Sequence, residues 1–408
     1  MRSAALCAAL AAVALAPAPV SAQSIALTES DALARLSMDS PRARAARAGV
    51  DIARVDVLAA SRWPNPRVTW DRESVAGVTE HMVMVAQPLP ITGRRGLDAD
   101  AASALLSASS SRADDDLRRL RADLRLAYAD LVAAQTRERD LGATLDRLRE
   151  LADVLAKREA AGDAAGFDRL RAEREVLDVE MDRNVAATDR ARAQATLASF
   201  FADAADPLRI VAVARSAPPS AVPPIEALVE QSESSRGELL ALQREIEAAR
   251  FAERAAVRRR IPEPEIVAGT KSSTLGGGDV GSVVTVHATV PLFDRARPEH
   301  ALALARGAQA QARADAFRRV LRGQIAVFRA AVVERRDAAE RYRSQAVSSA
   351  DQIERIAQIS YDAGERSILE LLDAYRTGLS ARVRQGTLDA SVRQAEIELE
   401  FASGWGIQ

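Results

Sequence analysis

The sequence is poor in the residues that usually carry chemistry in a protein site. Only one of its 408 residues is a cysteine, Cys7, three are histidines, and aromatic residues make up 4%. A lone cysteine excludes an intramolecular disulfide and any metal site built from several cysteines. The histidines, His81, His287 and His300, do not have the spacing of a metal-binding motif, and no catalytic constellation or cofactor motif is present. We therefore expect no enzyme activity, no cofactor and no bound metal.

An excess of charge of one sign is also lacking. Lysine and arginine number 56 against 57 aspartate and glutamate, a formal net charge of −1, and this balance argues against a nucleic-acid partner. After the first residues, no apolar run approaches the ~18 residues that a membrane-spanning helix needs, so any membrane span must consist of strands. The 28% of charged residues, together with abundant alanine, arginine, leucine and glutamate, is typical of long helices and coiled coils.

Residues 1–22 have the pattern of a cleaved signal peptide. Arg2 and an apolar run over 4–15 precede a small-residue cleavage pattern at the end of this segment. We expect the mature chain to start near Gln23; an uncleaved anchor is the alternative. Cys7 lies inside the segment without the small residues that precede a lipidated cysteine, so we expect no lipid anchor.

The most informative feature that is present is a pattern that occurs twice, about half the chain apart. The stretches WPNPRVTW, from Trp63, and IPEPEIVA, from Ile261, have the character of strands. A second strand-like stretch follows each of them and ends at a proline, and a long helical pattern with one small-residue turn comes next. The prolines at the strand ends are Pro64, Pro66, Pro88, Pro262, Pro264 and Pro291, and the two turns are at Gly162 and Gly364. We therefore predict a signal peptide (1–22), a first repeat (23–201), a connector (202–224) and a second repeat (225–408).

Each repeat is expected to contain one helix, two strands and a long helical hairpin. Proline and the residue before it disfavour helix, so the WPNP stretch ends the first helix. The first repeat is expected to have a helix over 28–62 with a break at Pro41, strands over 67–74 and 80–87, and helices over 97–160 and 167–201. The connector is expected to add a small strand. The second repeat is expected to have a helix over 225–260, strands over 263–273 and 282–290, a long helix to about 362 and a final helix from about 367.

The long helices carry apolar residues at heptad spacing, which favours coiled-coil packing. In the second long helix the expected buried seam is Ile325, Phe328, Val332, Ala339, Tyr342, Ala346, Ile353 and Ile356. Such narrow seams need neighbouring helices to cover them.

The strand over 282–290 alternates most clearly. Val284 and Val286 point to one face and Thr285 and His287 to the other, as in a strand with a lipid-facing and a water-facing side. The water-facing residues elsewhere are expected to include Arg67, Asp71, His81 and Lys271. Four strands are too few to close a barrel, which takes about eight, and open sheet edges are not tolerated in lipid. If the strands span a membrane, several chains must therefore combine them.

The two motif series, WPNP…QPLP…AAGD…DRL and IPEPE…VPLF…DAGERSILELLDA, resemble the TolC-type outer-membrane efflux protein family. The stretches LPITGRRG and PLFDRARPEH resemble its heavy-metal cation-efflux branch (the CzcC and CusC kind), with drug or general solute export as the alternative. The resemblance implies a mainly α fold with a small β part. It implies a homotrimer in the outer membrane of a Gram-negative bacterium, with a twelve-stranded β-barrel to which each chain gives four strands, and a long α-helical barrel in the periplasm. The implied function is a passive outer-membrane channel, served by a periplasmic adaptor protein and an inner-membrane pump of the RND type.

The resemblance also implies a gate at the periplasmic tips, near 161–168 and 361–374. The residues that correspond to gating positions are Tyr361, Arg366, Glu370 and Asp373 in the second tip and Asp168, the partner of Tyr361, in the first. Phe167 departs from the family pattern, in which a hydroxyl partner for the arginine can occur. The alternative for all of these residues is a solvated helix face with i,i+4 pairing.

Other interpretations of the chain remain open. A periplasmic coiled-coil adaptor also uses helical hairpins, but the sequence lacks the β-rich segments that flank them in such proteins. A periplasmic enzyme on a helical scaffold would need the catalytic constellation that is missing. Trp63 and Trp70 suit either a membrane-interface belt or ordinary packing, and the basic cluster 258–260 suits either the rim of a barrel or a solvated helix end.

Overall fold

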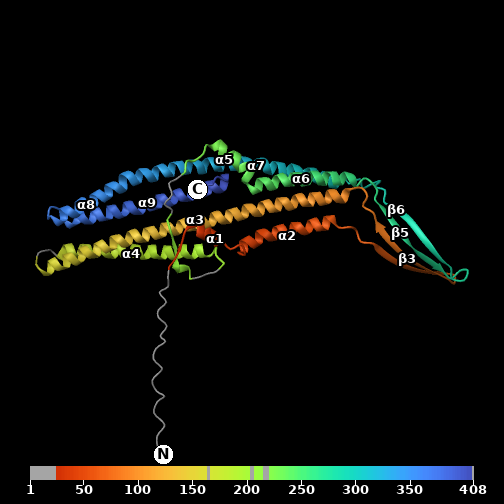
Figure 1. Cartoon of the computed structure of the whole chain (residues 1–408), viewed down its shortest axis with the longest axis horizontal. Helices are drawn as coiled ribbons and strands as arrows, with labels where there is room; N and C mark the ends of the chain where they lie inside the picture. The colour runs from red at the N-terminus through yellow and green to blue at the C-terminus, as the bar shows by residue number, and fades with distance from the viewer. Residues whose placement is uncertain (1–23, 163–165, 203–205, 215–219, 407–408) are drawn as a thin grey trace, which may run out of the picture. The chain divides into compact units, whose positions relative to one another are not determined.

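A computed structural model describes residues 24–162, 166–202, 206–214 and 220–406 of the chain (Figure 1). The predicted signal peptide lies outside the described residues. The chain forms two compact units. Unit 1 comprises the described residues of Met1–Leu36, Ala127–Ala217 and Ser349–Gly386, and unit 2 comprises those of Ser37–Leu126, Pro218–Ser348 and Thr387–Gln408. Each unit takes segments from both halves of the sequence.

The first predicted helix is two helices, separated where a break was expected. Thr28 caps α1 (Glu29–Ala34) by accepting a hydrogen bond from the backbone N–H of Asp31, whose carboxylate in turn accepts from the N–H of Thr28. This reciprocal arrangement satisfies two donors that a helix start leaves free. In α2 (Pro41–Ser61), Pro41 occupies the first turn, where a missing N–H costs nothing.

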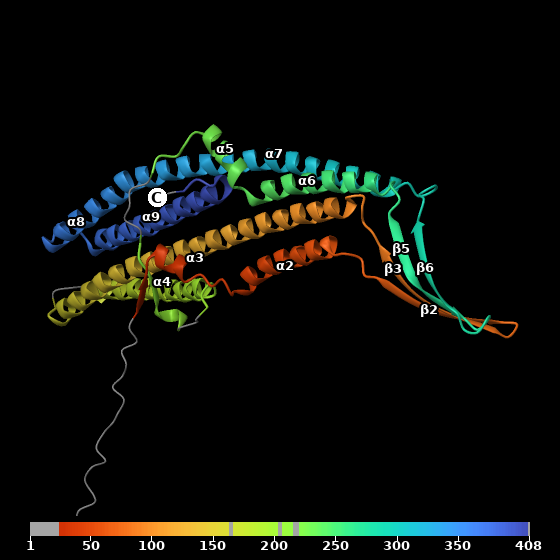
Figure 2. The same ribbon diagram turned by 45° about the vertical axis from the view of Figure 1, so that its right-hand side comes forward.

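The four predicted strands are confirmed and form one sheet in unit 2 (Figure 2). They are β2 (Arg67–Val75), β3 (Val78–Pro88), β5 (Pro264–Ser273) and β6 (Val280–Ala288), in the order β2-β3-β5-β6 with every neighbour antiparallel. Gly77 has a φ of 83° in the turn between β2 and β3, a conformation that glycine adopts without strain. The strand pairs of the two repeats therefore meet at β3 and β5.

The long helical hairpins are also present. In the first half, α3 (Arg94–Ala160) is followed by a turn at Gly162, with a φ of 81°, and then by α4 (Gly166–Ala198). In the second half, α8 (Ser348–Asp362) ends near Gly364, with a φ of 74°, and α9 (Ile368–Ser403) follows. Both predicted turn glycines adopt the left-handed conformation that ends helices.

The helix predicted over 225–260 is wrong in one respect, because it is broken into α5 (Ile225–Ser235) and α6 (Gly237–Arg258). The break is at Arg236, whose ψ of 112° is extended. Asp115 explains it: its carboxylate lies 3.1 Å from the Arg236 guanidinium and accepts a hydrogen bond from the N–H of Gly237 at 3.2 Å. A side chain distant in sequence therefore caps the new helix.

The connector forms a 3₁₀ turn, η1 (Pro207–Arg209), and the expected small strand, β4 (Ile210–Ala212). That strand pairs in parallel with β1 (Ile25–Leu27), which the sequence did not predict. The Tyr128 hydroxyl of α3 donates to the carbonyl of Leu27 or Val213, at 2.8 and 2.7 Å. These hydrogen bonds attach both short strands to α3.

The second long helix contains an unpredicted irregularity. After α7 (Arg297–Arg341) the chain makes a π-helical segment, η2 (Tyr342–Val347), before α8 begins. Before this segment the expected seam is confirmed, because Ile325, Val332 and Ala339 are at most 4% exposed.

Beyond η2 the predicted burial of Ile353 and Ile356 is wrong, since each is 48% exposed. The buried residues of α8 are Ala350, Glu354 and Ala357, one residue later than the heptad positions 349, 353 and 356. A π-helical turn holds one residue more than an α-helical turn. The extra residue in η2 accounts for the shift.

Each unit has its own apolar core. The core of unit 1 consists of leucines on α3 packed against α4, α8 and α9, including Leu145, Leu148, Leu155, Ala172, Val179, Ala357, Leu371 and Tyr375. A core of unit 2 includes Leu228, Leu321, Ile325, Val332, Ala395 and Leu399. The fold is therefore mainly α with a small β part, as predicted.

Candidate functional site

One face of the four-stranded sheet of unit 2 carries most of the sheet's charged side chains, interspersed with apolar residues such as Met82 and Val283. Side chains alternate between faces along a strand, and paired residues share a face. Arg67 and Glu265 lie on the same face and form an ion pair of 2.8 Å, as do Lys271 and Glu80 at 2.6 Å. The register adds Thr69, Asp71, Glu73, Thr285 and His287 to this face. Arg67, Asp71 and Lys271, which were predicted to face water, therefore share one face of the sheet.

The opposite face of the sheet is apolar and exposed. Its large apolar residues, which are between 40% and 74% exposed, are Val68, Trp70, Val83, Val85, Ile266, Val280, Val284 and Val286, and Arg72 is its one charged residue. His81 lies on this face, stacked on Trp70 with ring centroids 6.2 Å apart. The expectation that His81 shares a face with Arg67, Asp71 and Lys271 is therefore wrong, because the pairing of Arg72 with His81 places both on the face of Trp70.

The second tip, between α8 and α9 in unit 1, contains the predicted gate residue Tyr361. Its ring is half-buried against the core, and the guanidinium carbon of Arg158 lies 5.8 Å from the ring centroid. Burial raises the pKa of Tyr361, the negative charges of Asp168 and Asp362 raise this pKa further, and Arg158 opposes the change. Asp168 is thus near Tyr361, but within the described residues no hydrogen bond joins the two.

Arg366 lies in the turn before α9 and pairs with the first turn of that helix. Its guanidinium lies 2.7 Å from Glu370, and the other carboxylate oxygen of Glu370 accepts a hydrogen bond from the N–H of Ser367 at 3.0 Å. Phe167, which is 62% exposed, lies under the guanidinium of Arg171 at 4.6 Å. In the single chain, Arg366 and Phe167 therefore each contact a residue close to them in sequence.

Asp373 lines a groove of about 600 Å³ between α8 and α9 in unit 1. Glu370 and Arg366 also line it, and its apolar wall includes the exposed residues Ile353 and Ile356. Arg376 lines the groove as well, so two carboxylates, two guanidinium groups and an apolar wall share one open surface at the tip.

Two buried ion-pair clusters beside the tip were not predicted. The carboxylate of Glu175 on α4, which is 7% exposed, binds the guanidinium of Arg376 on α9. The carboxylate of Glu354 on α8, 8% exposed, lies 3.1 Å from Arg147 and 2.9 Å from Arg382. A sequence signal exists for both, because each glutamate interrupts an apolar seam, but the identity of its partner depends on the fold.

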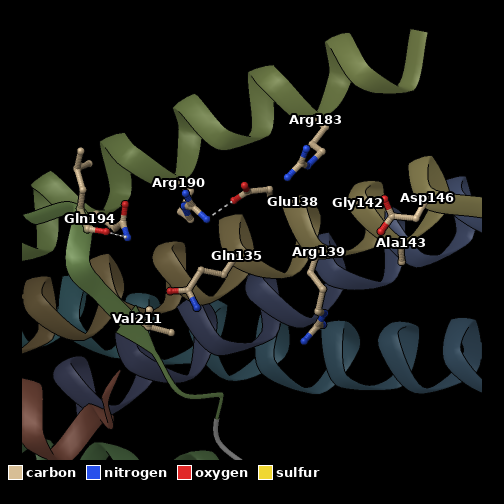
Figure 3. A pocket seen from close by; sticks show the side chains of 11 residues that line it. Gln135, Glu138, Arg139, Gly142, Ala143, Asp146, Arg183, Arg190, Gln194 and Val211 are labelled. Atoms are coloured by element: carbon tan, nitrogen blue, oxygen red, sulfur yellow. Dashed lines mark hydrogen bonds and ion pairs between the residues drawn. The ribbon is translucent and has the colours of Figure 1, made fainter. Parts of the chain in front are cut away.

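A second, polar groove of about 550 Å³ lies among α3, α4 and β4 in unit 1 (Figure 3). Glu138 on α3 and Arg190 on α4 form an ion pair of 2.8 Å across it. The Nε of Arg190 and the Oε1 of Gln194 are buried without a hydrogen-bond partner in the described ranges. Ordered water is the expected partner for such atoms, so we assign this groove a structural role.

No group of three or more histidine, cysteine, aspartate or glutamate side chains in the described ranges is arranged to hold a metal ion. Within the same ranges, no helix is both long and apolar enough to cross a membrane.

Comparison with known proteins places the fold. The sequence profile described as "Outer membrane efflux protein" matches residues 228–405. The structure is similar to that of a membrane protein from Pseudomonas aeruginosa, with 20% identity, a TM-score of 0.76, and coverage of 92% of this chain and 93% of that chain. It is similar to the Campylobacter jejuni CmeC outer membrane channel (14% identity, TM-score 0.76, 93% and 86% covered). It is also similar to CusC, which forms a transmembrane channel (16% identity, TM-score 0.74, 93% and 92% covered). Among curated proteins none matches the sequence.

Proposed function

We propose that this chain, whose residues 228–405 match the outer membrane efflux protein profile, is a member of that family and the outer-membrane channel component of a tripartite efflux system. The observation that carries this proposal is the sheet of unit 2, which has a charged face and an exposed, mostly apolar face, and whose outer strands β2 and β6 are each paired on one side only in the described residues. A sheet with these faces suits a barrel wall between lipid and an aqueous lumen. The channel is passive, so the energy for transport comes from its partners.

The free sheet edges support a trimer. Strands β2 and β6 each have a neighbour on one side only in the described part of the chain, and unpaired edges are not tolerated in lipid. Pairing of β2 with β6 of the next copy closes a ring, and three copies of four strands give the twelve-stranded barrel. Eight strands are the lower limit for such barrels, so one chain is not sufficient.

The helices of unit 1 support the same assembly. On α4, Ala172, Val179 and Ala186 are buried, whereas Leu177 and Met181 are 58% and 62% exposed on the other side of the helix. A helix with two apolar sides needs two neighbours, as in a closed ring of helices. On α8, Ile353 and Ile356 provide a second exposed apolar stripe.

The tips of unit 1 are the proposed gate. Tyr361, Arg366, Glu370 and Asp373 in one tip, and Asp168 near the other, are the residues to which we assign gating, and three copies place Glu370 and Asp373 as two rings of carboxylates. Such rings attract cations. We further propose a periplasmic adaptor and an inner-membrane pump of the RND type as partners, export by the signal peptide 1–22, and no lipid anchor. Heavy-metal cations are the proposed cargo.

The experiment that tests this function is a combined size and conductance measurement on the mature protein. In detergent we expect the mass of a trimer, and in a planar lipid bilayer we expect stepwise ion conductance. A monomer without conductance would contradict the proposal. Fractionation of cells provides a second check, because a periplasmic adaptor or enzyme would not be confined to the outer membrane.

A further inference from the structure

Arginines are concentrated at the end of the sheet that joins the helices. The register places this end at the start of β2 and β5 and at the end of β3 and β6, and Figures 1 and 2 show the helix ends of unit 2 beside it. The linking segments 61–66, 89–98, 258–263 and 289–300 contain Arg62, Arg94, Arg95, Arg258, Arg259, Arg260, Arg295 and Arg297. We call these eight residues the arginine collar. The same segments contain four acidic residues, Asp98, Glu263, Asp294 and Glu299, so their net charge is 8 − 4 = +4, in a chain whose net charge is −1.

Four of the eight collar arginines bond to other residues of the segments that link the strands to the helices. Arg94 bonds to Glu263 at 3.2 Å, and Arg259 to Glu299 at 2.6 Å. The Arg95 guanidinium donates to the carbonyl of Ser61 at 2.6 Å, and that of Arg260 to the carbonyl of Arg295 at 3.3 Å. These four guanidinium groups fix the connections between strands and helices.

The other four collar arginines do not connect the linking segments in this way. The side chains of Arg62, Arg258, Arg295 and Arg297 are exposed, and none forms an ion pair or a hydrogen bond with a residue of the described ranges. Each of these four free guanidinium groups can bind an oxyanion with two parallel hydrogen bonds.

Exposed apolar residues lie in the same linking segments. Trp63 is 57% exposed, Ile91 70%, Leu292 64% and Phe293 98%. Phe293 lies five residues after the last residue of β6, whose apolar face carries Val284 and Val286. A nearly fully exposed phenylalanine beside free arginines is unfavourable in water but suits a membrane interface, where rings and cations lie at the headgroup level.

The opposite end of the sheet provides an internal comparison. Its turns, residues 75–79 and 273–280, contain no lysine or arginine, and Asp279 is their only charged residue. Solubility alone gives no reason for this difference, whereas an anionic layer at one end of the sheet does.

We propose that the arginine collar binds the phosphate headgroups of the bilayer leaflet at the helix end of the sheet, with Phe293 and Leu292 inserted among the acyl chains. This inference rests on the proposed function, because it requires the sheet to lie in a membrane. The four free arginines of the collar, Arg62, Arg258, Arg295 and Arg297, contact the phosphates. Anionic phospholipid is preferred to zwitterionic lipid, because an anionic headgroup has no ammonium group to repel the arginines.

The test measures how added lipid changes the thermal unfolding midpoint of the detergent-purified mature protein. We expect phosphatidylglycerol to raise the midpoint by several degrees more than phosphatidylcholine. The triple variant Arg258→Gln, Arg295→Gln, Arg297→Gln should lose this difference. The matched control, Arg313→Gln, Arg322→Gln, Arg355→Gln, removes three exposed arginines of α7 and α8 that bond to no residue of the described ranges, and should retain it.

Equal effects of the two lipids on the wild-type protein, or equal losses in both triple variants, would overturn the proposal. Inorganic phosphate at matched ionic strength forms a separate arm: if it stabilises the protein as much as phosphatidylglycerol does, the collar binds free anions and not a bilayer. Conductance of the wild-type protein and of each variant in planar bilayers distinguishes a failure of the collar proposal from a failure of the proposed function. Pores without a lipid preference overturn the collar alone, whereas the absence of pores from the wild-type protein overturns the proposed function.

Discussion

Arg376 on α9 donates hydrogen bonds to both carboxylate oxygens of Glu175 on α4, with 2.7 Å between the Nε of Arg376 and the Oε1 of Glu175. The pair connects the last helix of the chain to the first tip hairpin within unit 1. Its two members differ in environment, since the Glu175 side chain is 7% exposed and that of Arg376 is 62% exposed. The buried partner therefore depends on the exposed one.

This difference predicts an asymmetry between two single substitutions. Arg376→Gln leaves a buried carboxylate without its cation, and we expect it to cost about 3 kcal/mol. Glu175→Gln leaves an arginine that water can solvate, and we expect it to cost about 1 kcal/mol. Thermal unfolding midpoints of the two variants and of the double variant test this; if Glu175→Gln is the more harmful change, the assignment of the buried partner is wrong.

The proximity of Glu354 to Gly378 predicts that a larger residue at position 378 destabilises the fold. A Cβ on Gly378 would lie 2.5 Å from the Oε1 and 2.8 Å from the Cδ of Glu354, and Arg147 and Arg382 hold that carboxylate in place. Gly378→Ala must therefore displace a buried ion-pair cluster, and we expect a lower unfolding midpoint. Gly386→Ala, on the same helix, is the control: its Cβ would meet nothing nearer than 3.7 Å, so the gain in helix propensity, about 1 kcal/mol, should raise the midpoint.

The π-helical segment η2 predicts which deletions the second long helix tolerates. One residue removed from η2, such as Gln345, converts it to α-helix and brings the seams before and after it into one heptad register. We expect this variant to fold with a nearly unchanged unfolding midpoint. Deletion of Gln324, an exposed residue inside α7, shifts one flank by a residue and should abolish folding. Equal damage from both deletions would show that the segment has another role.

The strands and the turns could be predicted because their signals are local. Proline ends the helix before β2, and Gly162 and Gly364 mark helix ends where only glycine adopts the required φ cheaply. Alternation along β6 indicated its two faces correctly. His81 was misplaced because its face depends on the register with β2, and a single residue does not reveal register.

The missed features depend on contacts between distant segments. The break at Arg236 requires Asp115, 121 residues away, and β1 exists because β4 pairs with it. At the candidate gate, the sequence analysis linked Tyr361 to Asp168, and in the structure Asp168 lies near enough for its charge to help raise the pKa of Tyr361. The sequence alone did not identify the pair of Arg376 and Glu175, because an arginine on an exposed helix face resembles any solvated residue until its partner is known.

The raised pKa of Tyr361 predicts a pH effect. The folded protein keeps this proton at pH values where the unfolded chain, with the ordinary value of 10.0, has lost it. Stability from this group is therefore fully present below pH 10 and is lost as the pH rises above it. Tyr361→Phe cannot ionise, so its unfolding midpoint should fall less between about pH 8 and about pH 11 than that of the wild-type protein. Tyr375 and Tyr128, whose pKa values are also raised, are common to both proteins, and identical losses would contradict the prediction.

The carboxylates of the tip groove predict the ion selectivity of the proposed channel. Glu370→Gln with Asp373→Asn removes two negative charges per chain from one surface, and we expect lower selectivity for cations, measured as the reversal potential in a salt gradient. Arg366→Gln removes a positive charge 2.7 Å from Glu370 and should shift the reversal potential in the opposite direction. Glu226→Gln with Glu230→Gln, exposed on α5 in unit 2, is the control and should have no effect. Because salt screens exposed charges beyond about 10 Å at 0.1 M, the differences should shrink as ionic strength rises; a shift that is independent of salt, or equal in the control, would exclude the tip carboxylates as the selectivity element.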